Sequence, residues 1–78
     1  MGNLKKYNEC YMHSFQIAED QLQSLTYQSI TAWDSVGHLN LIAALEEAFD
    51  IMMDTDDIID LSSYEKGKEI LKKYDVAI

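Results

Sequence analysis

The segment from Asp34 to Asp50 limits the possible folds more than any other part of the chain. Its apolar residues recur with the spacing of one helix face, which predicts an amphipathic helix. Asp34 or Ser35 can accept hydrogen bonds from the free backbone N–H groups of the first turn. The stripe expected to face a core consists of Leu41, Ile42, Leu45, Ala48 and Phe49. The opposite face carries Asn40, Ala43, Glu46, Glu47 and Asp50.

The segments before this helix contain no competing strand pattern. Proline is absent, and no alternating run of β-branched residues is long enough for a sheet. A first helix is predicted from about Asn3 to Ser14, with one apolar face formed by Leu4, Tyr7, Tyr11 and Phe15. An irregular segment follows from about Phe15 to Trp33, with one helical turn expected near Glu19 to Gln23.

Two further helices are predicted after the central one. A short helix fits Asp56 to Asp60, with Asp54 or Thr55 as its cap and an inward face formed by Ile58, Ile59 and Leu61. The last helix begins at Ser62, which has the spacing of a capping box with Glu65, and it frays near Val76. Its apolar face consists of Tyr64, Ile70, Leu71 and Tyr74.

The predicted fold class is therefore all-α. We expect a small four-helix bundle with a long loop between the first and second helices and a short third helix. The predicted core contains Leu41, Leu45, Phe49, Leu61, Ile70 and Leu71. A domain of 78 residues buries only about 60% of its unfolded surface. That leaves no room for a deep catalytic cavity and argues against a self-sufficient enzyme.

Charge is distributed unevenly along this chain, whose formal net charge is -8. No Lys or Arg occurs between Tyr7 and Glu65. The acids of the second half of this stretch are Asp34, Glu46, Glu47, Asp50, Asp54, Asp56, Asp57, Asp60 and Glu65. Such a surface repels nucleic acid and anionic membranes. It is either a solvated face or a docking surface for basic partners.

The cysteine content and the lack of a targeting pattern indicate the cellular compartment to expect. Cys10 cannot form a disulfide within the chain, and we expect it in the core or at its boundary because no cationic neighbour would activate the thiol. The sequence has neither a signal-peptide pattern nor a long apolar run. A reducing cytoplasm is therefore the expected location, and a monomer the expected state.

Two chemical interpretations of the polar residues fail on spacing. Asp34, Ser35 and His38 have the residue types of a catalytic triad, but residues so close in sequence cannot place the base between the other two. His38 and His13 are therefore expected to be exposed polar residues. The aspartates from Asp54 to Asp60 lack the glycine and the final glutamate of an EF-hand, so no metal site is predicted.

The segment WDSVGHLNLIAALEEAFDIMMDTDDI resembles the core of the acyl carrier proteins. In that family Asp-Ser-Leu or a close variant opens the second helix, and an acidic LEEEF-like stretch follows ten residues later. Here Asp34-Ser35-Val36 and Leu45-Glu46-Glu47 stand in the same register, followed by Phe49-Asp50 and an Asp-rich turn. The similarity extends from about Ile30 to Tyr74, so residues 1–78 are interpreted as a single carrier domain.

The resemblance implies that Ser35, within the Asp34-Ser35 motif, receives 4′-phosphopantetheine from coenzyme A through a phosphopantetheinyl transferase. The thiol of this arm would hold acyl groups as thioesters for partner enzymes, and the chain itself would catalyse nothing. The partners implied are acyl-loading and acyl-transferring enzymes with basic docking surfaces. The docking positions carried over from the family are Val36, Glu46, Glu47, Asp56 and Asp57.

The sequence departs from the carriers of fatty-acid synthesis at two places. Asn40 stands where those carriers commonly have an acid, and Ala32-Trp33 replaces the frequent Gly-Ala before Asp-Ser. These differences favour a discrete carrier in a specialised biosynthetic pathway. An aminoacyl or peptidyl carrier remains an alternative, although the Gly-Gly common before the modified serine of such domains is missing. An unmodified acidic interaction module is the other alternative.

Overall fold

The computed structural model describes residues 2–78, and this part of the chain contains four α-helices and no β-strand. The helices are α1 (Asn3–Phe15), α2 (Ser35–Phe49), α3 (Thr55–Asp60) and α4 (Tyr64–Lys72). A single 3-10 turn, η1 (Glu19–Gln21), interrupts the connection between α1 and α2. The predicted all-α bundle, its long first loop and its short third helix are confirmed.

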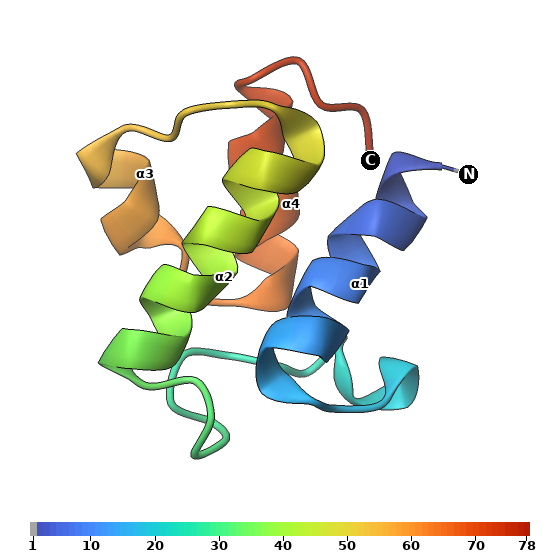
Figure 1. Ribbon diagram of the computed structural model, residues 1–78, viewed down its shortest axis with the longest axis vertical. Helices are drawn as coiled ribbons and strands as arrows, with labels where there is room; N and C mark the ends of the chain where they lie inside the picture. The colour runs from blue at the N-terminus through green and yellow to red at the C-terminus, as the bar shows by residue number, and fades with distance from the viewer. Residues whose placement is uncertain (1) are drawn as a thin grey trace.

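Figure 1 shows α1 and α2 as neighbouring helices that run in opposite directions, with α4 behind them and α3 beside α2. The loop between α1 and α2 crosses one end of the bundle, and both chain ends lie at the other. Asn3 ties the ends together, because its Nδ2 donates to the carbonyl oxygen of Ala77 at 3.0 Å.

Aromatic side chains dominate the centre of the bundle. Tyr7, Tyr11 and Trp33 have no exposed surface. Tyr11 packs edge-on against Trp33, with ring centroids 5.7 Å apart, and Phe15 stacks on Trp33 at 5.2 Å. The other almost fully buried side chains include Leu22, Leu25, Leu41, Ile42, Leu45, Leu61, Tyr64, Ile70 and Leu71.

One predicted core position, Phe49, lies at the edge of the core instead of inside it. Phe49 is only half-buried, at the last residue of α2, where Lys6 Nζ lies 5.2 Å from the centre of its ring. Leu4, on the apolar face predicted for the first helix, is 45% exposed and lines a cleft with residues of the η1 segment and α4. Both residues have the correct helical phase but lie in a terminal turn of their helix, where neighbouring elements cover them only in part.

The loop from Gln16 to Asp34 is anchored rather than loose. Leu22, Leu25 and Trp33 point into the core. The backbone N–H of Tyr27 donates to the carbonyl of Ser62 at 2.8 Å, and the N–H of Tyr64 donates to the carbonyl of Leu25 at 2.9 Å. The loop is thus joined to the connection between α3 and α4.

The start of α2 depends on one cap and one close approach. Asp34 is the N-cap, and its Oδ1 accepts a hydrogen bond from Gly37 N at 2.8 Å. A Cβ atom on Gly37 would lie 1.9 Å from the carbonyl oxygen of Ala32. Glycine is therefore required at this position, because it lets the end of the loop fold back against the first turn of α2.

Two predictions for the second half of the chain need correction. Ile59 points outward and is 71% exposed, whereas Asp57 of the same short helix is buried. The cap of α4 is Ser63, not Ser62: Ser63 Oγ accepts from Lys66 N at 2.9 Å. The hydrophobic pattern of a six-residue helix is too short to define its inward face, so neighbouring elements decide it.

Candidate functional site

Ser35 is the first residue of α2, and its side chain is exposed. Asp34 provides the cap, so the Ser35 hydroxyl is not needed to hold the helix end. The Oγ atom of Ser35 lies 3.4 Å from the hydroxyl oxygen of Tyr27. Ser35 therefore presents a hydroxyl that is accessible to a large molecule and is bound only weakly by its surroundings.

A cleft of about 280 Å³ is lined by Tyr27, whose hydroxyl contacts Ser35, and by His38 of α2, whereas Ser35 itself is not among its lining residues. The remaining lining residues are Ile58, Ile59, Leu61 and Ser62. We call this the Ser35 cleft. Its walls come from the first loop, α2, α3 and the connection to α4, and its surface is mainly apolar.

His38 is not the exposed surface residue that the sequence predicted. It is half-buried between Trp33 and α3. The indole Nε1 of Trp33 donates to His38 Nδ1 at 3.0 Å, and His38 Nε2 lies 2.7 Å from the carbonyl oxygen of Ile58. Because an indole N–H can only donate, Nδ1 accepts and Nε2 carries the proton given to Ile58. The imidazole thus links the end of the first loop to α3.

The hydrogen bonds of His38 also decide whether Asp34, Ser35 and His38 can act as a catalytic triad. Both ring nitrogens of His38 are engaged with Trp33 and Ile58, and Asp34 is engaged with Gly37. The structure therefore does not bring Asp34, Ser35 and His38 together as a triad. His13, by contrast, is exposed as expected.

Three of the five predicted docking positions are exposed. Val36 has 67% of its surface exposed, and Glu47 and Asp56 also point to solvent. Leu39, one helical turn after Val36, is 63% exposed but was not among the predicted docking positions. Exposed leucine has no sequence signature, because only the packing of α2 shows which apolar residues remain uncovered. The outer face of α2 therefore combines apolar and acidic side chains.

Glu46 differs from its neighbour Glu47. It is half-buried, and its Oε2 accepts a hydrogen bond from the backbone N–H of Met53 at 2.8 Å. Its own carbonyl accepts from Ile51 N at 3.1 Å. Glu46 thus holds the turn that follows α2, so replacing it would alter local structure as well as surface charge.

Asp57 is not available as a docking group, which corrects the prediction. Its side chain is only 7% exposed and pairs with Lys73, whose Nζ lies 2.6 Å from Oδ1. The hydroxyl of Tyr74 donates to the other carboxylate oxygen. The hydrogen bonds from Lys73 and then Tyr74 lower the pKa of Asp57. Asp57 therefore attaches α3 to the C-terminal segment.

Replacing Asp57 with asparagine should lower the melting temperature at pH 7 by about 4–8 °C, the shift expected for loss of one stabilising interaction in a small domain. Because the folded-state pKa is depressed, the contribution is present above the ordinary aspartate value of about 3.9 and is lost as pH falls through the folded-state value. Melting followed by circular dichroism from pH 7 to pH 2 measures this. Asp56→Asn, at an exposed neighbour, is the control. An equal effect of both changes would contradict the role of Asp57.

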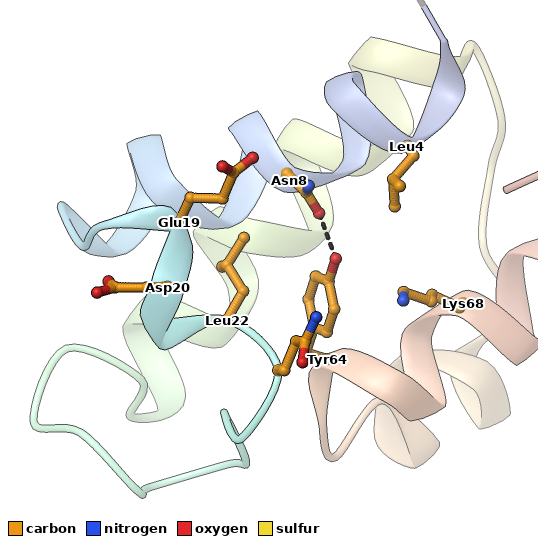
Figure 2. Close-up of a pocket in the computed structure, with 8 residues that line it drawn as sticks. Leu4, Asn8, Glu19, Asp20, Leu22, Tyr64 and Lys68 are labelled. Atoms are coloured by element: carbon orange, nitrogen blue, oxygen red, sulfur yellow. Dashed lines mark hydrogen bonds between the residues drawn. The ribbon is translucent and has the colours of Figure 1, made fainter.

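A second cleft, of about 490 Å³, lies away from Ser35 (Figure 2). Its lining residues come from α1, the segment around η1 and α4: Leu4, Asn8, Glu19, Asp20, Leu22, Gln23, Tyr64 and Lys68. Figure 2 shows the hydroxyl of Tyr64 bonded to Asn8, and Lys68 Nζ lies 4.6 Å from the centre of the Tyr64 ring. The polar groups at its centre are thus paired with one another.

Cys10 and possible metal ligands add no second reactive centre. Cys10 is buried, as expected, and burial raises the pKa of its thiol to about 11. Its Sγ–H donates to the carbonyl of Ala44 at 3.6 Å. Among residues 2–78, no three His, Cys, Asp or Glu side chains are grouped so that they could hold a metal ion.

Comparisons with protein families, curated proteins and solved structures find no family model, protein or structure that matches this chain. The resemblance to the acyl carrier proteins therefore remains a hypothesis based on the residues quoted above. No helix within residues 2–78 has both the length and the apolar character needed to cross a membrane.

Proposed function

We propose that this chain is an acyl carrier protein, in which Ser35 is the attachment point of 4′-phosphopantetheine. The observation that carries the proposal is the combination of an exposed Ser35 hydroxyl at the start of α2 with an apolar cleft lined by Tyr27, the residue that contacts Ser35. Asp34 occupies the capping role, so modification of Ser35 would not cost the helix its N-cap. The match of the Asp34-Ser35-Val36 motif adds support from the sequence.

In the attachment step, Ser35 Oγ would attack the pyrophosphate phosphorus of coenzyme A that bears the pantetheine. A new P–O bond forms to Oγ, the bond to the 3′,5′-ADP leaving group breaks, and the serine proton passes to a base of the transferase. The arm supplies a terminal thiol that can hold an acyl group as a thioester. The role of this chain is to present Ser35 and its cleft, and to keep the attached group near each partner.

Intact mass spectrometry tests this proposal directly. The unmodified protein is incubated with coenzyme A and a broad-specificity phosphopantetheinyl transferase, and one phosphopantetheine group should be added per chain. An established carrier protein serves as the positive control for the transferase. If that control gains mass and this chain does not, the carrier proposal is wrong, and an unmodified interaction module becomes the better interpretation.

The outer face of α2 is proposed to guide partner enzymes, and Glu47 is the cleanest position at which to test it. Glu47→Lys should lower the kcat/KM of modification by about two- to fivefold at low salt, because one exposed charge contributes about 0.2–1 kcal/mol to encounter and orientation. The defect should shrink as salt screens the charge. Glu69→Lys on α4 makes the same charge change elsewhere on an exposed residue. Equal rates for both variants would mean that α2 has no special role in docking.

A further inference from the structure

The contact between Tyr27 and Ser35 joins two exposed side chains from different elements. Tyr27 belongs to the loop before α2, and its hydroxyl lies 3.4 Å from Ser35 Oγ. This distance is longer than the roughly 2.5–3.0 Å usual for a hydrogen bond between two hydroxyls, so the contact contributes little to holding Ser35 itself. Holding the Ser35 side chain in the unmodified protein therefore does not explain why the Tyr27 hydroxyl lies next to it.

Tyr27 is held in place from several sides. Its backbone N–H donates to the carbonyl of Ser62 at 2.8 Å. Its ring meets the rings of Trp33 and His38 edge-on, with centroids 6.3 Å and 5.6 Å away. Although Tyr27 is 37% exposed, these contacts direct its hydroxyl toward Ser35 and the Ser35 cleft.

The chemistry of a phosphate ester suits this arrangement. Esterification of Ser35 bonds phosphorus to Oγ, so the anionic oxygens lie two bonds beyond Oγ, next to the atom that the Tyr27 hydroxyl contacts. A hydroxyl that donates to an anionic oxygen makes a shorter and stronger bond than one that donates to a neutral hydroxyl. The neighbouring carboxylate of Asp34 can only accept when ionised. Tyr27 is thus a suitable donor beside a phosphate on Ser35.

We propose that Tyr27 is a positioning residue for a phosphate ester on Ser35. Its hydroxyl donates a hydrogen bond to a phosphate oxygen and directs the attached group along the Ser35 cleft. The identity of the ester rests on the proposed carrier function. The hydrogen bond itself depends only on a phosphate at this serine, so the two can be tested separately.

The first test uses phosphoserine incorporated at position 35 during translation, which needs no transferase. The phosphate is titrated by ³¹P NMR in the parent sequence and in Tyr27→Phe, which keeps the ring and the backbone contact. A hydrogen bond to the dianion favours the charged form. The phosphate pKa should therefore be higher in Tyr27→Phe than in the parent. Asp34 and His38, the other titratable groups near Ser35, are present in both proteins, so the difference reports on the hydroxyl.

The second test uses protein modified by the transferase. The ³¹P resonance of the phosphodiester should shift in Tyr27→Phe but not in Ser24→Ala, which removes an exposed hydroxyl of the same loop that does not line the cleft. Circular dichroism should be unchanged in both variants. Identical phosphoserine titrations in the parent and Tyr27→Phe would overturn the proposal. If the titrations differ but the transferase adds no mass, the role of Tyr27 stands and the carrier function fails.

Discussion

Ser35→Ala should abolish the gain of mass in the transferase reaction completely. The reason is chemical, because no other atom of residue 35 can form the P–O bond. The fold should survive the change, because Asp34 and not Ser35 provides the N-cap of α2. The Ser35 hydroxyl makes only a long contact with the hydroxyl of Tyr27, so little stability is lost with it. The far-ultraviolet circular dichroism spectrum and the melting temperature should therefore match those of the parent protein.

The matched control for this loss is Ser62→Ala. Ser62 is also exposed and lines the Ser35 cleft, so it tests whether any serine near the cleft can be modified. It should gain one phosphopantetheine group at the parental rate. If Ser35→Ala still gains mass, the attachment site lies elsewhere, and peptide mapping of the modified protein would locate it.

Trp33→Ala should produce the largest loss of stability among the single changes considered. Removing a fully buried aromatic side chain costs about 3–5 kcal/mol, and small domains have total stabilities of about 5–15 kcal/mol. Trp33 has no exposed surface and packs against Tyr11 and Phe15. The change also removes the donor to His38 Nδ1, so the loop would lose its link to α3.

Urea unfolding followed by circular dichroism measures this cost. Phe49→Ala is the control, because Phe49 has a similar aromatic side chain but is only half-buried, so we expect a loss of about 1–2 kcal/mol. Trp33→Phe keeps part of the packing and should lie between the two if Trp33→Ala is too unstable to analyse. A Phe49→Ala loss equal to or larger than the loss in Trp33→Ala would contradict this assignment of the core.

The sequence alone predicted the features that depend on local periodicity. The apolar stripe of α2, its start at Asp34-Ser35 and the exposure of Ser35 follow from residues within a few turns of one another. The short α3 and the turn at η1 were also predictable near their observed positions. In each case caps and helical spacing carry the information, and both are determined by residues close together in the chain.

The tertiary structure decided what surrounds these elements. Trp33 and His38 adjoin Ser35 in sequence, yet their burial depends on α1 and α3 closing over them. Tyr27 reaches Ser35 because the loop is bonded to Ser62 and the Tyr27 ring packs against Trp33 and His38. Asp57 is withdrawn from the acidic surface by Lys73, sixteen residues later. Periodicity cannot predict such contacts, since they form between segments whose relative position is set only when the bundle packs.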